Sequence, residues 1–157
     1  MIRSSFPLVA PGQIEAVTRV MESGQLSPGP ETEAFEKEFS EYIAPPGVDY
    51  PNYPYCIFTN SCTSALKIAY KWAKDYAPYI MYPENTFCAT YSAAEEMGMK
   101  SYRYQKGDIT PGPRVNMHMG GVKDETPCLI EDSAHRIEAN DPLVGKIRCY
   151  SFHATKN

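Results

Sequence analysis

The segment 59–64 is the first of three that carry side chains able to do chemistry. Its small polar residues include Ser61, Cys62 and Thr63, and they stand where a helix would begin. The free backbone N–H groups and the dipole of a helix start can hold a phosphate. Serine and threonine are also ordinary N-cap residues, so a helix cap alone is the simpler interpretation.

Two further segments carry a carboxylate pair and a lysine. Glu131 and Asp132 directly follow a predicted buried strand at 128–130. Because burying an unpaired charge is costly, one of them needs a cation, a metal or a protonated ligand nitrogen, unless the pair lies in an exposed loop. Lys156 lies just beyond a predicted strand at 148–152. A lysine there is usually a solvated surface residue, but desolvation or neighbouring cations can make it a Schiff-base nucleophile.

The order of these groups along the chain points to one cofactor. An anion site, a carboxylate and a lysine are the groups that bind pyridoxal 5′-phosphate (PLP): they clamp the phosphate, pair with the ring nitrogen and form the Schiff base. Phe87 follows a predicted strand at 79–82 and either stacks on the flat ring or packs in the core. Asp132 and Lys156 are therefore the candidate cofactor ligands.

The elements that must position these groups follow an α/β pattern. Apolar residues at spacings of three and four predict helices at 11–23, 32–43, 65–73 and 89–97. Short apolar runs predict strands at 55–58, 79–82, 101–104, 115–119, 128–130 and 148–152. Strands that alternate with helices predict an α/β domain with a largely parallel sheet, in which ligands gather at the carboxyl ends of the strands.

Composition limits the partners and the location. The 157 residues carry a net charge of −4, which offers no broad cationic surface for nucleic acid. No apolar run reaches the about 18–20 residues of a membrane span, and the N-terminus resembles no secretory signal, so we expect a cytoplasmic protein with no membrane partner. The five cysteines and three histidines fit no ligand spacing, so we expect no metal site.

Five stretches along the chain carry a family resemblance: SGQLSPGPETEAFEKEFSEYI at 23–43, NSCTSALKIA at 60–69, PENTFCAT at 83–90, CLIEDSAH at 128–135 and CYSFHATKN at 149–157. In these stretches, which occur in family order, the chain resembles the DegT/DnrJ/EryC1/StrS family of sugar aminotransferases, fold-type I PLP enzymes. The resemblance implies a three-layer α/β/α fold with a mostly parallel sheet, like the large domain of those enzymes. It implies one unit over residues 1–157, with helices and a loop at 1–54 and the cofactor-binding part at 55–157.

The resemblance also implies a role for each site residue. Lys156 would form the Schiff base with PLP and move protons during catalysis. Asp132 would bind the ring nitrogen, and His135 would contact the 3′-oxygen of the ring. Phe87 would lie against the ring face, and His118 is a candidate for substrate binding. The phosphate would bind at the start of a helix and the end of a strand, to Ser61, Cys62, Thr63 and Ser151.

The implied reaction moves an amino group, usually from glutamate, onto a keto group of a nucleotide-linked sugar. Family members continue for roughly as long again and add a small C-terminal domain that this chain lacks. The segments 105–114 and 119–127 are also too short for the helices that family members carry there. We therefore expect a homodimer or a complex with a separate C-terminal half. A non-catalytic subunit that binds PLP or a sugar nucleotide, or a truncated remnant, is the alternative.

Overall fold

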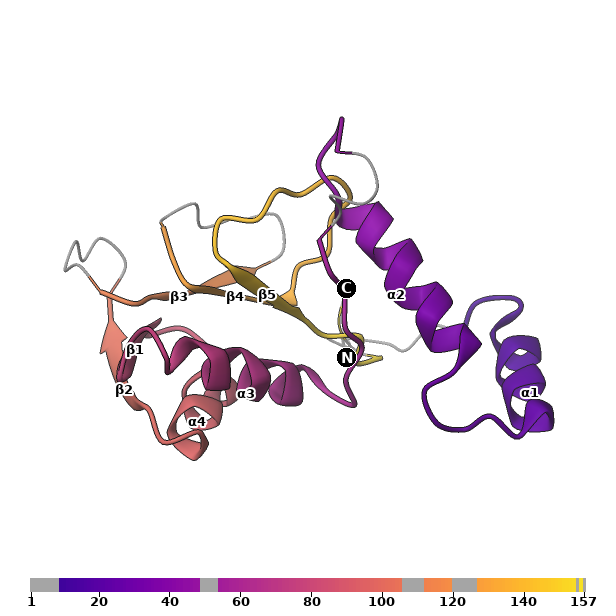
Figure 1. Cartoon of the computed structure of the whole chain (residues 1–157), viewed down its shortest axis with the longest axis horizontal. Coiled ribbons are helices and arrows are strands. Elements are labelled where there is room, and N and C mark those ends of the chain that lie inside the picture. The colour runs from indigo at the N-terminus through magenta and orange to yellow at the C-terminus, as the bar shows by residue number, and fades with distance from the viewer. Residues whose placement is uncertain (1–8, 49–53, 106–111, 120–126, 155, 157) are drawn as a thin grey trace, which may run out of the picture. The chain divides into compact units, whose positions relative to one another are not determined.

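The computed structural model describes residues 9–48, 54–105, 112–119, 127–154 and 156, without the side chains of 117–119. The chain divides into two compact units (Figure 1). Unit 1 contains Met1–Phe58 and Glu138–Pro142, and unit 2 contains Thr59–Ile137 and Leu143–Asn157. That residues 1–157 belong to one domain stays a prediction.

Unit 1 is built from two helices, α1 (Gln13–Ser23) and α2 (Pro30–Ile43), and both confirm the predicted helices. α1 ends before Gly24, whose φ of 69° lies in the left-handed region that favours glycine. α2 begins at Pro30, whose fixed φ and missing N–H suit the first position of a helix. Glycine and proline therefore set the turn between the two helices.

The predicted strand at 55–58 is wrong. These residues belong to no strand, and the Ile57 side chain is 75% exposed. The ring of Phe58 packs edge-on against Phe35 of α2 with 5.3 Å between centroids, and the Phe58 N–H donates to Oε1 of Glu36 at 2.6 Å. Four consecutive apolar residues lack the alternation that identifies a half-buried strand, and a strand also needs a neighbouring strand to pair with.

Unit 2 has the predicted α/β arrangement. Its elements in chain order are α3 (Cys62–Ala73), β1 (Tyr79–Pro83), α4 (Cys88–Glu96), β2 (Lys100–Tyr104), β3 (Val115–Met119), β4 (Ile130–His135) and β5 (Ile147–Tyr150). β1 pairs with β2, and β3, β4 and β5 pair side by side in that order. A bridge between Met81 and Arg114 joins the two groups. Every strand pair among the described residues is parallel, so the strands present their carboxyl ends at one edge.

Helices α3 and α4 lie together on one side of the strands (Figure 1). Leu66 and Tyr70 of α3 pack with Ala93 of α4 in the core, and all three are almost completely buried. The Tyr70 hydroxyl donates to the Thr90 carbonyl oxygen at 2.5 Å and joins the two helices. The sequence predicts a helical layer on each side of the sheet. In the described part of unit 2, α3 and α4 form one of these layers.

Strand β4 is longer than predicted and contains the two carboxylates. The sequence predicts that the strand ends at Ile130, with Glu131 and Asp132 directly after it, but β4 continues to His135. Glu131 is 0% exposed and Asp132 is 3% exposed, so the interpretation of an exposed loop is wrong. Because successive side chains of a strand point to opposite faces of the sheet, the two carboxylates lie on opposite faces.

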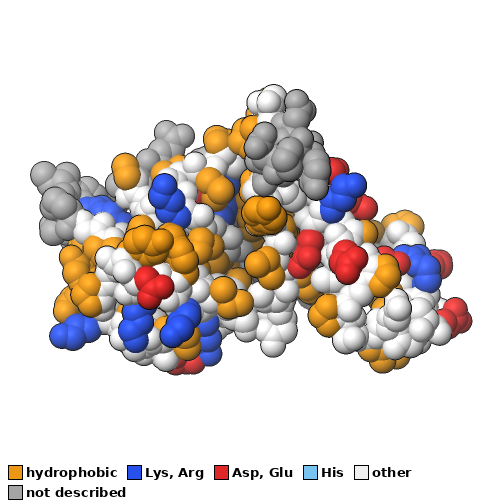
Figure 2. Space-filling view, viewed as in Figure 1, with side chains coloured by type: hydrophobic (Ala, Val, Ile, Leu, Met, Phe, Trp, Pro, Cys, Tyr) orange, Lys and Arg blue, Asp and Glu red, His pale blue; other side chains and the backbone are white. Residues whose placement is uncertain are grey.

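The surface of the described residues mixes charged and hydrophobic side chains in both units (Figure 2). Helix α1 exposes three large apolar side chains at helical spacing, Ile14, Val17 and Met21, each at least 60% accessible. Among the described residues, no helix combines the length and the apolar character that crossing a membrane requires. The apolar stripe of α1 is thus open in the described unit.

Candidate functional site

The start of α3 is a capped helix N-terminus with polar side chains around it. Ser61, in extended conformation, accepts a hydrogen bond from the Ser64 N–H at 3.1 Å, and the Ser64 hydroxyl donates to Oδ1 of Asn60 at 2.6 Å. The capping interpretation is therefore confirmed. It leaves the amides of Cys62 and Thr63 without an acceptor inside the helix, since first-turn amides have none. An anion at this helix start could accept hydrogen bonds from them.

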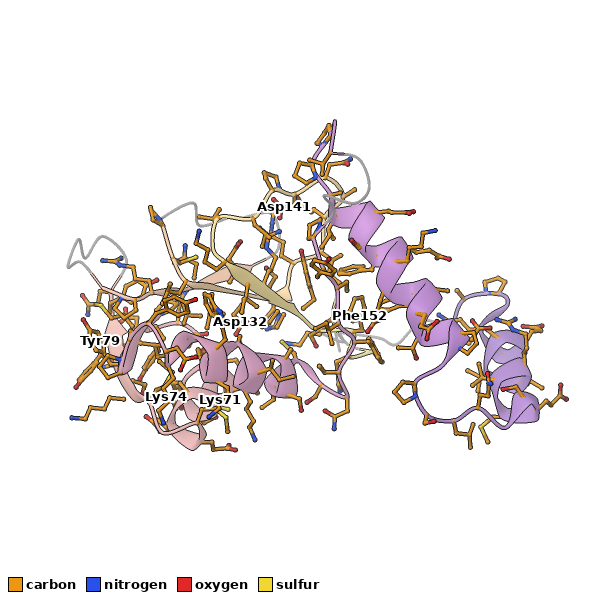
Figure 3. All side chains as sticks on the ribbon, viewed as in Figure 1. Lys71, Lys74, Tyr79, Asp132, Asp141 and Phe152 are labelled. Carbon is orange, nitrogen blue, oxygen red and sulfur yellow. The ribbon has the colours of Figure 1, made fainter. Side chains whose placement is uncertain are left out.

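Asp132 is a buried carboxylate held by neutral donors. Its Oδ2 accepts a hydrogen bond from the Thr90 hydroxyl at 2.7 Å, and its Oδ1 accepts one from the Ala134 N–H at 3.1 Å. Figure 3 shows Asp132 between the strands and α3. Neither donor is charged, so the negative charge of Asp132 is solvated by hydrogen bonds but not neutralised by them. Such a carboxylate suits a protonated ligand nitrogen.

Glu131 has a different partner and a different role. Its Oε2 accepts hydrogen bonds from Nε and Nη2 of Arg148 on β5, at 2.9 and 2.6 Å, and the Arg148 side chain is only 2% exposed. Its Oε1 accepts from the backbone N–H groups of Val144 and Gly145, both at 2.8 Å. This buried ion pair joins β4, β5 and the loop between them. The cation expected for one of the two carboxylates is therefore the partner of Glu131, not of Asp132.

Lys156 lies against an imidazole and an aromatic ring. Its Nζ is 2.7 Å from Nε2 of His135 and 5.8 Å from the centre of the Phe87 ring. Because an ammonium group can only donate, the histidine nitrogen must accept. Burial and the Lys156 charge lower the pKa of His135, while Asp132 opposes them. The imidazole is thereby held in the neutral form that accepts a hydrogen bond from Lys156.

The pKa of the Cys62 thiol depends on burial and on the charges of Asp132 and Lys156. Burial, followed by the negative charge of Asp132, raises the pKa of Cys62 to about 12, while the positive charge of Lys156 lowers it. The charges of Asp132 and Lys156 therefore act in opposite directions on one thiol at the start of α3. At neutral pH this thiol is protonated and is not a nucleophile.

The structure therefore brings together most of the residues that the sequence singles out: Ser61, Cys62, Thr63, Phe87, Asp132, His135 and Lys156. Ser151 is buried, and its hydroxyl oxygen accepts a long hydrogen bond of 3.4 Å from the His153 N–H. Its contact with a phosphate stays a prediction. His118 belongs to β3, but its side chain lies outside the described residues.

Two residues that touch this region are missed by sequence reasoning. Thr90 binds Asp132 across 42 positions of the chain, and Arg148 binds Glu131 across 17. Thr90 stands inside a predicted helix next to alanines, where a threonine carries no signal of a ligand. The sequence of β5 could have indicated that Arg148 forms a buried ion pair, because an arginine within a short apolar strand needs a buried anion.

The combined groups define what the site can do. The amine of Lys156 can attack an aldehyde or ketone once it has lost its proton, and the neutral imidazole of His135 orients it by accepting a hydrogen bond. Phe87 is 61% exposed and offers a ring face. Among the described residues, no cluster of three or more histidine, cysteine or acidic side chains is placed to hold a metal ion.

Comparisons with known proteins give one family. A profile of the DegT/DnrJ/EryC1/StrS aminotransferase family matches residues 9–104. SpsC, a spore coat polysaccharide biosynthesis protein of Bacillus subtilis (strain 168), is 27% identical over 186 aligned residues, which cover 98% of this chain and 46% of SpsC.

Solved structures share the fold. Spr1654 of Streptococcus pneumoniae, named as a sugar aminotransferase and solved in its PLP form, matches with a TM-score of 0.80 and 18% identity, over 99% of this chain and 50% of that chain. DesV of S. venezuelae, in complex with a ketimine intermediate, matches with a TM-score of 0.72 and 21% identity, over 91% of this chain and 45% of that chain. The predicted aminotransferase fold is confirmed. The chain spans about half the length of the relatives that it matches.

Proposed function

Because the chain belongs to the DegT/DnrJ/EryC1/StrS aminotransferase family, we propose that it binds PLP and serves in a PLP-dependent sugar aminotransferase. The observation that carries the proposal is the distance of 2.7 Å between Nζ of Lys156 and Nε2 of His135. His135 lies on β4, the strand that also contains the buried Asp132. The PLP form of Spr1654 supports the cofactor, and its name supports the sugar substrate.

The residues present fit this cofactor. The ring nitrogen of PLP, when protonated, needs an anion, and Asp132 is a buried carboxylate whose donors are neutral. The phosphate needs N–H donors, and the first turn of α3 has free amides at Cys62 and Thr63. The aldehyde needs an amine, and Lys156 lies beside the ring of Phe87. Each part of PLP therefore has a matching group in unit 2.

Each residue has a proposed task. Lys156 would hold the cofactor through its amine and would hold or move a proton beside it. Asp132 would bind the ring nitrogen and favour its protonated form, in which PLP supplies an electron sink. His135 would contact the 3′-oxygen. Phe87 would lie on the ring face, while the start of α3, with Ser61 as its cap, and Ser151 would bind the phosphate.

The proposed substrates are glutamate as amino donor and a nucleotide-linked keto sugar as acceptor, with His118 on the sugar side. The names of SpsC and Spr1654 support polysaccharide and sugar chemistry. The active assembly that we propose is a homodimer or a complex with a C-terminal half, located in the cytoplasm.

Reduction with borohydride tests the proposal directly. The purified chain is mixed with PLP, reduced and digested, and mass spectrometry then locates the modified residue. We expect visible absorbance from the bound cofactor and a single phosphopyridoxyl group on Lys156. The Lys156→Ala variant should lose both signals, whereas Lys146→Ala, which removes an exposed lysine outside the site, should keep both.

Two outcomes separate the functions. Turnover with glutamate and a keto-sugar nucleotide, by the chain alone or with a separately produced C-terminal half, supports the aminotransferase. Labelling of Lys156 without turnover in either sample supports a binding subunit. Equal labelling of wild type and Lys156→Ala would refute the assignment of the cofactor lysine.

A further inference from the structure

Thr90 is a buried polar residue whose hydroxyl contacts the candidate cofactor carboxylate. It lies on α4, it is 0% exposed, and its Oγ1 donates to Oδ2 of Asp132 at 2.7 Å. The hydroxyl oxygen of Thr86 is 2.7 Å from the same Oγ1. The backbone carbonyl of Thr90 accepts from the Tyr70 hydroxyl at 2.5 Å, so the residue is held on its backbone side by α3 as well.

The supply of protons sets the direction of these hydrogen bonds. An ionised carboxylate only accepts, so the single hydroxyl proton of Thr90 goes to Asp132. The contact between Thr86 and Thr90 must then use the proton of Thr86. The result is a directed chain from Thr86 through Thr90 to Asp132. Each hydroxyl in such a chain polarises the next and strengthens the bond to the charged group.

The hydrogen bond from Thr90 also fixes the carboxylate in space. Oδ1 of Asp132 is bonded to the Ala134 N–H on its own strand, and Oδ2 is bonded to Thr90 on α4. One donor on each oxygen sets the plane of the group and leaves one lone-pair direction on each oxygen for a ligand. We propose that Thr90 is a positioning residue, which fixes the carboxylate of Asp132 and aims it at the ring nitrogen of PLP. This inference rests on the proposed function.

Packing alone does not account for a threonine at this place. Thr90 is 0% exposed and lies on the same helix as Ala93 and Ala94, which belong to the apolar cluster of α3 and α4. Valine has nearly the same shape, favours an apolar site and needs no hydrogen-bond partner. A hydroxyl in this position is useful only if something accepts its proton, and the acceptor here is Asp132.

The test compares four variants for binding of PLP, with labelling of Lys156 as a second signal. Thr90→Val removes the hydroxyl, and Thr90→Ser keeps it. Thr86→Val removes only the second donor of the chain, and Thr18→Val on α1 is an exposed control in unit 1. We expect the dissociation constant of PLP to rise about tenfold in Thr90→Val, as for the loss of a charge-assisted hydrogen bond. We expect about twofold in Thr86→Val and no change in the other two.

A pH series separates positioning from a structural role. Without the Thr90 donor the charged carboxylate is less favoured, so binding of PLP should fail at a higher pH on the acid side in Thr90→Val than in wild type or Thr90→Ser. The other titratable groups that interact with Asp132 are the same in all variants: Cys62, Tyr70, His135 and Cys149. The acid-side difference is therefore assigned to the missing hydroxyl.

The outcomes distinguish this inference from the function on which it rests. If wild type is labelled on Lys156 and Thr90→Val binds PLP with unchanged affinity and pH profile, the positioning role is refuted while the function stands. If wild type is not labelled, both are refuted. If Thr90→Val does not fold, Thr90→Ser and Thr86→Val decide: an effect of Thr86→Val on the acid side supports the chain of hydroxyls, and its absence refutes it.

Discussion

The contact between Lys156 and His135 depends on the charge state of the imidazole. The ammonium of Lys156 needs an acceptor, and the lowered pKa of His135 keeps that acceptor available at neutral pH. Protonated His135 could neither accept this hydrogen bond nor avoid repelling Lys156. The charge state of a single imidazole therefore controls the environment of the amine.

This charge state predicts a pH dependence of stability. Because the pKa of His135 is lower in the folded than in the unfolded chain, the unfolded chain takes up the proton first as the pH falls. The contribution of His135 to stability is present above about pH 6.5 and is lost below it, until the folded pKa is passed. We expect urea unfolding from pH 8 to pH 5 to show this loss in wild type and not in His135→Gln. The variant of an exposed histidine, His153→Gln, should behave like wild type, and parallel curves for wild type and His135→Gln would contradict the prediction.

The Cys62 thiol gives a second prediction at the residue scale. With a pKa of about 12, the fraction of thiolate at pH 8 is about 10⁻⁴, so alkylation should be very slow. We expect iodoacetamide to modify the exposed Cys88 well before Cys62, as followed by mass spectrometry of the folded chain. Both cysteines should react at similar rates in denaturant. Equal rates in the folded chain would show that Cys62 is not in the environment described.

At the scale of the elements, the contact between β4 and β5 depends on a buried ion pair. Arg148 is the cationic partner of Glu131, which is 0% exposed. Removal of Arg148 leaves the buried carboxylate of Glu131 without this cation, and such a loss costs about 3–5 kcal/mol. We expect Arg148→Met to lower the free energy of unfolding by that amount in urea titrations.

Two variants control this experiment. Arg103→Met, which removes an exposed arginine on β2, should change the free energy of unfolding by about 0.5 kcal/mol or less. The double variant Glu131→Gln with Arg148→Met removes both charges and should recover part of the loss. If Arg148→Met costs no more than Arg103→Met, the pair does not stabilise the contact.

Local patterns were sufficient to predict most elements. The apolar spacing identifies all four helices, and short apolar runs identify β1, β2, β3 and β5. The run at 55–58 failed because a buried strand and an apolar loop look alike over four residues. For β4, the charges of Glu131 and Asp132 suggest an end of the strand, although each of these carboxylates has buried partners.

The candidate site could be predicted where the residue type itself signals chemistry. Lys156, Asp132 and the polar segment before α3 stand out by their type and their place next to strands. Thr90 and Arg148 could not be found in this way, because their roles arise from contacts between distant parts of the chain. The spacing of apolar residues predicts helices and strands, but it does not show which distant side chains contact each other.

At the scale of the whole molecule, exposed apolar side chains predict association. Ile14, Val17 and Met21 form an apolar stripe on α1, and a helix with such a stripe usually packs it against another surface. We expect light scattering to give a mass above that of one chain at micromolar concentration. Val17→Glu should shift the mass downward, whereas Thr18→Glu, on the neighbouring position of the same helix, should not. A stable monomer of the wild-type chain would contradict this prediction.

Because Glu131 and Asp132 lie on opposite faces of β4, the length of the chain before them determines which face each carboxylate occupies. Inserting or deleting a single residue before Glu131 would exchange the faces on which the two groups stand. Arg148 would then meet the wrong side of the strand, and Asp132 would lose its hydroxyl donor. One change of length in this strand would therefore break both the buried ion pair and the hydrogen bond from α4.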